Sequence, residues 1–212
     1  RKELAFFAPP LAGYQERNES GGFGPFHPFA SPALLDWNDP NLRFIDLSGD
    51  GHEDILLAQG DHFLWYPSLA KGGFASPLRL NQTRDEERGP ALVFADGTQT
   101  IFLADMSGDG LTDLVRIRNG QVCYWPNLGY GRFGAKVVMG GANHFDNPDQ
   151  FDPKRIRLAD VDGSGTADLL YLDERGATLY RNLAGNALAP GEVLDRFPCL
   201  QLDTDWAEVV DL

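Results

Sequence analysis

Nine aspartates lie in three short segments, and their spacing is the most informative chemical feature of the sequence. Each segment has the pattern D-x-[DS]-x-[DS]-G-x-x-D, which places oxygen-bearing side chains at positions 1, 3, 5 and 9 around a glycine turn. Carboxylate, hydroxyl and backbone carbonyl oxygens are the hard ligands that calcium takes in proteins. The pattern therefore predicts one Ca²⁺ ion per loop, about three ions in all.

The predicted ligands occupy the same positions in every loop, and position 7 contributes its backbone carbonyl oxygen, as in an EF-hand. Zinc is disfavoured because no histidine or cysteine side chain belongs to the ligand set. The predicted ligands are Asp46, Ser48, Asp50, His52 and Asp54 in the first loop, Asp105, Ser107, Asp109, Leu111 and Asp113 in the second, and Asp160, Asp162, Ser164, Thr166 and Asp168 in the third.

The loops differ from an EF-hand in two ways. Position 12, where an EF-hand has a bidentate glutamate, is Leu57, Arg116 or Tyr171. The flanking residues are typical of β-strands, not of paired helices. An alternative interpretation of the same pattern is a network of Asx-turns, in which the Asp and Ser side chains only cap backbone N–H groups.

The loops belong to a longer internal repeat. Their first aspartates, Asp46, Asp105 and Asp160, follow one another at intervals of 59 and 55 residues. Similarity continues beyond each loop at constant offset, with an aromatic residue 12 positions after the last loop aspartate and a small polar residue two further on. The predicted units are 42–99, 100–154 and 155–205, with 1–41 as the end of a preceding unit and 206–212 as the start of a next one.

Each unit contains about four short runs of β-branched and aromatic residues separated by turn residues. Glycine and proline make up 38 of the 212 residues, and few windows are long enough for a helix. The sequence therefore predicts an all-β fold, a single partial β-propeller with about three four-stranded antiparallel blades, partial terminal blades and calcium loops. A two-sheet sandwich is the alternative, but it does not explain the constant period.

Composition excludes several classes of function. The net charge of −13 argues against a nucleic-acid partner, and no apolar run is long enough to span a membrane. Two cysteines, Cys123 and Cys199, cannot form a disulfide framework and are expected to be buried thiols. The four histidines are scattered, and no nucleophile motif is present. We therefore expect a protein that is not an enzyme, with a glycoside hydrolase as the least favoured alternative.

The repeat resembles the FG-GAP and VCBS repeats of integrin-type β-propellers, on the evidence of the aspartate loops and the Gly-Phe segments that precede a short strand. Three segments, residues 124–134, 149–152 and 157–166, are similar to the propeller region of the B component of bacterial insecticidal Tc toxin complexes. That component is also related to SpvB-type virulence proteins.

The resemblance implies a scaffold role in a secreted, extracellular virulence complex. The family's B component joins the C component to form a hollow shell around a toxic enzyme, and its propeller docks on the pore-forming A component and gates the cargo. The partners would then be other toxin-complex proteins, and self-association that closes the propeller ring is a further expectation. The alternative from another class is an integrin-like extracellular adhesion module that binds protein or glycan.

Overall fold

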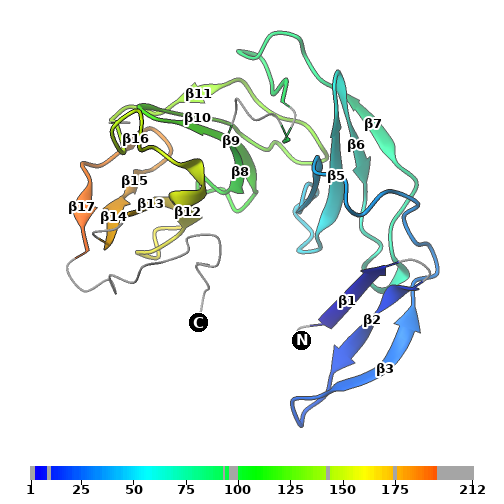
Figure 1. The fold of residues 1–212 in the computed structure, drawn as a ribbon. Helices are drawn as coiled ribbons and strands as arrows, with labels where there is room; N and C mark the ends of the chain where they lie inside the picture. Colours follow the sequence, from blue (N-terminus) through cyan, green and yellow to red (C-terminus); the bar gives the residue numbers. More distant parts are fainter. Residues whose placement is uncertain are drawn as a thin grey trace.

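The computed structural model describes residues 3–8, 11–92, 94–95, 100–141, 144–173 and 176–194. These residues form an all-β protein in which four antiparallel sheets follow one another along the chain in a β-propeller arrangement. The sheets stand side by side around an arc (Figure 1), not face to face in two layers. We call them the first to fourth blades. No helix of the described residues is both long and apolar enough to cross a membrane.

The last three blades share one topology, in which four strands pair in sequence order. The second blade contains β4 (Leu42–Ile45), β5 (Asp54–Gln59), β6 (His62–Tyr66) and β7 (Leu78–Asn81). The third contains β8 (Ile101–Ala104), β9 (Asp113–Arg118), β10 (Gln121–Trp125) and β11 (Val137–Val138). The fourth contains β12 (Ile156–Ala159), β13 (Asp168–Asp173), β14 (Gly176–Tyr180) and β17 (Glu192–Val193).

Short elements complete these blades. The third strand of the fourth blade is followed by the small hairpin of β15 (Asn182–Leu183) and β16 (Ala187–Leu188). Single bridges at the same place in the second and third blades join Ser68 to Phe74 and Asn127 to Phe133. Two 3₁₀ turns, η1 (Ala70–Gly72) and η2 (Pro153–Arg155), lie in connecting segments.

The blade count corrects the prediction of about three blades with partial terminal blades, because the structure has four sheets in the propeller arrangement. Residues that were expected only to end a preceding blade form a three-stranded sheet, the first blade, from β1 (Glu3–Ala8), β2 (Leu11–Arg17) and β3 (Phe23–Pro28). The predicted start of a next blade at 206–212, the end of the 155–205 unit and Cys199 lie outside the described residues. The unit boundaries themselves stay predictions.

The core lies between successive blades because alternate residues of a strand point to opposite faces of the sheet. Leu56 and Ala58 of the second blade pack in one buried cluster with Leu114 and Trp125 of the third. On the other face of the third blade, Val115 and Ile117 pack in the cluster that contains Leu169 and Tyr171 of the fourth. One blade cannot bury both of its faces alone, so each blade depends on its neighbours.

Aromatic stacking joins the first blade to the second. The ring centroid of Phe7 lies 4.5 Å from that of Trp37 and 5.4 Å from that of Phe44. Phe29 packs edge-to-face on Phe74 at 6.2 Å. This junction therefore relies on ring contacts, which contribute about 0.5–1.5 kcal/mol per pair beyond their buried area.

Candidate metal-binding loops

The three predicted loops connect the first and second strands of the last three blades, at residues 46–54, 105–113 and 160–168. We call them the first, second and third aspartate loops. In each, the glycines at positions 4 and 6 adopt positive φ angles between 75° and 87°, a backbone region that other residues rarely occupy. Glycine at position 6 of the pattern, and at position 4 of all three loops, therefore has a direct conformational cause, because only glycine adopts this backbone conformation without strain.

The aspartate at position 1 holds the turn closed by accepting hydrogen bonds from its backbone. One oxygen of Asp46 accepts from Gly49 N (2.7 Å) and the other from Gly51 N (2.8 Å). Asp105 and Asp160 accept from the corresponding N–H groups at 2.7–2.9 Å. Burial alone would raise the pKa of Asp46, but four backbone N–H groups outweigh it and keep the pKa below its usual range.

The aspartate at position 9 is buried and faces the blade. Asp54, Asp113 and Asp168 are at most 1% exposed. Each accepts the N–H of loop position 2 at 2.9–3.2 Å and the N–H of the residue 14 positions further on at 2.6–2.8 Å. Asp54 also accepts the indole N–H of Trp65 at 2.9 Å. This carboxylate therefore links the start of the loop, through hydrogen bonds, to the segment that follows the third strand of the same blade.

Burial at this position has an electrostatic cost. Burial raises the pKa of Asp113 to about 6, although hydrogen bonds from Asn127, Met106 and Ser107 act in the opposite direction. Burial also raises the pKa of Asp54. A carboxylate removed from water is stabilised by N–H donors only in part, so a nearby cation would favour the charged form.

The third loop brings its carboxylates together most closely. Oxygens of Asp160, Asp162 and Asp168 all lie within 4.8 Å of one another, and no other trio of acidic, histidine or cysteine residues in the described chain meets this criterion. The first two loops have serine at position 3, and its hydroxyl donates to the position 1 carboxylate at 3.3 Å (Ser48) or 3.4 Å (Ser107). The donor chemistry of all three loops fits a hard cation, and the third loop fits best.

Residues at positions 3, 5 and 7 make further hydrogen bonds within the loops. Asp50 and Asp109 each accept the N–H of position 7 at 2.9 Å, from His52 and Leu111. In the third loop Asp162 accepts the N–H of Ser164 at 3.0 Å, and the hydroxyls of Ser164 and Thr166 lie 3.0 Å apart. These are the bonds of an Asx-turn network, and they leave further oxygen lone pairs for an ion.

The loops also join neighbouring blades, a role that sequence reasoning missed. Tyr130 N of the third blade donates to Leu47 O of the first loop at 2.7 Å, and Ala167 N of the fourth blade donates to Asp105 O of the second at 2.7 Å. The side-chain amide of Asn182 donates to Met106 O at 3.0 Å. The sequence signal for this role is the small polar residue at constant offset from each loop, since Asn127 and Asn182 at this offset both donate across a junction between blades.

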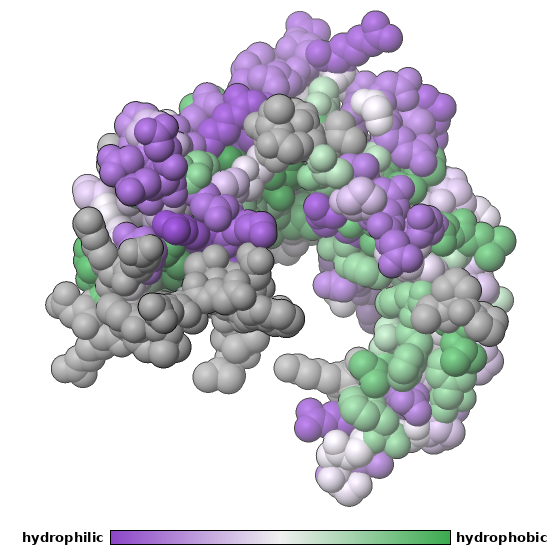
Figure 2. Space-filling model, in the orientation of Figure 1, coloured by the Kyte–Doolittle hydropathy of each residue, from purple (hydrophilic) through white to green (hydrophobic). Residues whose placement is uncertain are grey.

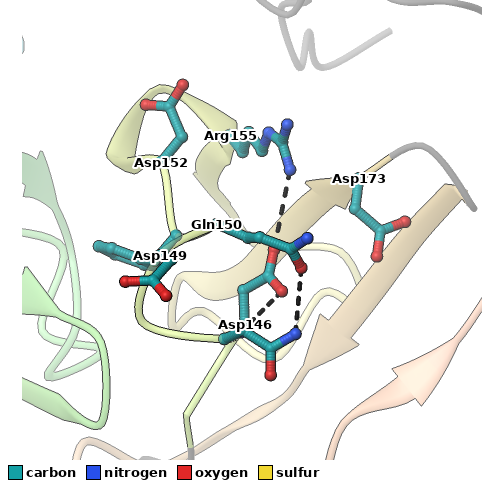
Figure 3. Close-up of a pocket in the computed structure, with 8 residues that line it drawn as sticks. Asp146, Asp149, Gln150, Asp152, Arg155 and Asp173 are labelled. Atoms are coloured by element: carbon teal, nitrogen blue, oxygen red, sulfur yellow. Dashed lines mark hydrogen bonds and ion pairs between the residues drawn. The ribbon is translucent and has the colours of Figure 1, made fainter.

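A second polar feature is an acidic hollow of about 560 Å³ beside the fourth blade. Figure 3 shows Arg155 reaching toward Asp146, whose carboxylate lies 3.7 Å from the guanidinium and accepts the Tyr171 hydroxyl at 3.2 Å. The hollow contains residues 149–152, one of the segments that carried the family resemblance. Its lining is Asp146, Asn147, Asp149, Gln150, Phe151, Asp152, Arg155 and Asp173.

Comparison with known proteins finds resemblance among solved structures. A chain of the Photorhabdus luminescens Tc holotoxin pore superposes with a TM-score of 0.78 and 30% identity over 92% of this chain. A TcdB2–TccC3 chain superposes with a TM-score of 0.50 and 23% identity over 93%. A lectin of Agrocybe aegerita that recognises non-reducing terminal N-acetylglucosamine shares the fold, with a TM-score of 0.58 and 19% identity over 85%.

The chain spans only a small part of the proteins it resembles. It corresponds to 9% of the Tc holotoxin chain, 9% of the TcdB2–TccC3 chain and 45% of the lectin. No protein-family model and no curated protein matches the sequence.

Proposed function

We propose that this chain is a non-catalytic, calcium-stabilised segment of the β-propeller in the B component of a Tc toxin complex. In this role it is a scaffold and docking part that joins the toxin shell to its pore-forming partner and gates the cargo. The observation that carries the proposal is the 30% identity to the Tc holotoxin chain over 92% of this sequence. The proposal places the chain among FG-GAP and VCBS-type repeats related to SpvB, in a secreted virulence complex.

Hydrogen bonding within the loops supports a structural role for their carboxylates. The position 1 and position 9 aspartates accept several backbone N–H groups each, which shape the turn and clasp the blade. A bound Ca²⁺ would supply positive charge to oxygens that already lie close together, most of all in the third loop. Neutralising that charge would stabilise the loops and, through them, the contacts between blades.

Binding of the pore-forming partner tests the docking role. The chain is immobilised, and a purified Tc A component is passed over it in biolayer interferometry. We expect saturable binding that is lost when the chain is heat-denatured. The absence of binding by chain that is folded by circular dichroism would overturn the docking role.

Calcium binding is tested separately by isothermal titration of EDTA-treated protein. We expect endothermic or exothermic saturation by Ca²⁺, and a loss of the tightest site in Asp162→Asn. The matched control is Asp149→Asn, which removes an exposed carboxylate of the acidic hollow outside the loops. A titration that shows no heat, together with a melting temperature unchanged by EDTA, would exclude the calcium role.

A further inference from the structure

The second and third aspartate loops contact each other directly. Ala167 N, at position 8 of the third loop, donates to Asp105 O, at position 1 of the second, at 2.7 Å. A Cβ placed on Gly108 would meet the Thr166 side chain at 2.9 Å, so position 7 of the third loop packs on position 4 of the second. A change in the conformation of one loop would therefore move groups that the other loop contacts.

A buried asparagine makes a second connection between the same two loops. The side-chain amide of Asn182 donates to Met106 O of the second loop at 3.0 Å and to Ala167 O of the third at 3.1 Å. Its backbone N–H donates to the Asp168 carboxylate at 2.8 Å. Met106 N in turn donates to the Asp113 carboxylate at 2.9 Å. A continuous path of hydrogen-bonded residues therefore links the position 9 carboxylates of the two loops.

The asparagine is fixed in this place by its surroundings. Asn182 is 6% exposed, and its side-chain oxygen accepts Gly185 N at 2.8 Å, so both ends of the amide are used. The same junction contains a buried apolar cluster that includes Met106, Tyr124 and Leu188. Figure 2 shows hydrophilic residues in purple over much of the surface and hydrophobic ones in green recessed between the blades. A hydrogen bond broken in such a place leaves a polar group buried without a partner, which is costly.

The junction between the second and third blades repeats this arrangement. Asn127 is fully buried, and its side-chain amide donates to Asp46 O of the first loop at 3.4 Å. Its backbone N–H donates to the Asp113 carboxylate at 2.8 Å. A Cβ placed on Gly49 would meet the Leu111 side chain at 2.9 Å. Both junctions therefore use a buried asparagine together with a contact of position 7 on position 4.

We propose that these contacts couple neighbouring loops, so that ordering of one loop tightens the next and Ca²⁺ binds adjacent loops with positive cooperativity. The third loop, where three carboxylates converge, fills first and raises the affinity of the second. Coupling between two sites is reciprocal, so occupancy of the second loop strengthens the third by the same factor. The calcium part rests on the proposed function. The coupling itself rests only on contacts within the chain.

The coupling is tested first in EDTA, without metal. Asp160→Ala removes the carboxylate that accepts two glycine N–H groups and closes the third loop. In the second loop, Gly108 N and Gly110 N make the equivalent bonds, so their amide exchange with solvent, measured by NMR, reports on that loop. We expect it to quicken at least about fivefold. Exchange at Gly49 and Gly51 of the first loop should change less. Unchanged exchange in the second loop would overturn the coupling.

Asn182→Ser separates the connection from the loops themselves. Serine is the natural residue at the equivalent position of the second blade, where Ser68 N donates to the loop carboxylate at 2.6 Å. The variant therefore keeps the backbone N–H and loses the amide that reaches Met106 O. In this background Asp160→Ala should affect the second loop less than in the parent, as a double-mutant cycle measures.

The matched control is the same substitution in the same hairpin. Asn186 is exposed, and its side-chain amide donates to Ala184 O at 3.0 Å. Asn186→Ser should leave the effect of Asp160→Ala on the second loop unchanged. If the effect is as large with Asn182→Ser as with this control, the buried asparagine does not carry the coupling and its assigned role is wrong.

Calcium titration then measures the cooperativity, with the signals of Gly108 and Gly110 following the second loop. Asp162→Asn, in the third loop, should raise the Ca²⁺ concentration that half-saturates the second loop at least about fivefold. Asp149→Asn, in the acidic hollow, should leave it unchanged. An unchanged half-saturation in Asp162→Asn would overturn the cooperativity alone. No calcium response by any loop of the parent would overturn the proposed calcium role and the cooperativity together, while the exchange measured in EDTA still decides the coupling.

Discussion

The second and third aspartate loops have nearly the same sequence pattern but different surroundings. Met106, at position 2 of the second loop, is fully buried under the fourth blade, whereas the corresponding Val161 of the third loop is 47% exposed. In the third loop, position 3 is an aspartate and three carboxylates converge. In the second, position 3 is Ser107. The comparison separates two roles that the sequence pattern combines: joining blades and gathering carboxylates.

The largest expected difference concerns position 2. Met106→Lys would bury a charge without a partner and should lower the free energy of unfolding by about 3–5 kcal/mol. Val161→Lys, at the exposed position, should change it by less than about 0.5 kcal/mol. Urea unfolding followed by tryptophan fluorescence measures both. Similar losses in the two variants would show that the third loop is packed as tightly as the second.

The next effect concerns the hydrogen bonds that the buried aspartate at position 9 accepts. Asp113→Ala removes the acceptor of three N–H groups, those of Met106, Ser107 and Asn127. Buried donors left without partners should cost about 3 kcal/mol in total. Asp109→Ala, at an exposed position that accepts one N–H group, is the control and should cost about 0.5 kcal/mol. Thermal melts of both variants in EDTA would check the difference.

A pH dependence of about 2 kcal/mol should follow from the same carboxyl group. The pKa of Asp113 is raised from 3.8 to about 6 in the folded protein. The folded state therefore holds this proton more tightly than the unfolded state, so its contribution is fully present below about pH 4 and is lost as the pH rises through 6. The stability difference between parent and Asp113→Asn, measured in EDTA from pH 4 to 7.5, should show this slope. A difference that is independent of pH would contradict it.

The smallest effect would make the second loop resemble the third. Ser107→Asp adds a carboxylate at position 3, where the third loop has Asp162. Since calcium affinity increases with the number of charged ligands, we expect the second loop to bind Ca²⁺ about tenfold more tightly. Isothermal titration of the variant should show the change. Glu53→Asp, outside the predicted ligand set, is the control and should leave the affinity unchanged.

The fold class could be predicted from the sequence because each repeat has the length and the number of strands of a propeller blade. Short β-type segments recur at a constant period, and two glycines mark a tight turn in each repeat. This combination is typical of antiparallel sheets that stack as propeller blades, which is the arrangement observed. The first blade was not predicted as a sheet of its own because residues 1–41 contain none of the aspartate loops that define the other units.

The candidate site was only partly predictable. The pattern marked every loop oxygen, but it did not show that Asp54, Asp113 and Asp168 turn toward the blade, since burial depends on residues distant in sequence. The contacts between blades, such as Asn182 to Met106 O, join residues 76 positions apart. The sequence near either residue does not identify its partner. It shows only a polar residue among apolar ones. Calcium occupancy of the loops stays a prediction.

The hydrogen bonds of each position 9 aspartate stay within its own blade. Among the described residues, the contacts between blades reach only the next blade. The chain is in this respect a linear array of cooperative units coupled to their nearest neighbours. Mechanical tension applied across it would then release one sheet at a time, in steps, and a protein drawn through a narrow passage could lose its blades in order without a single concerted rupture.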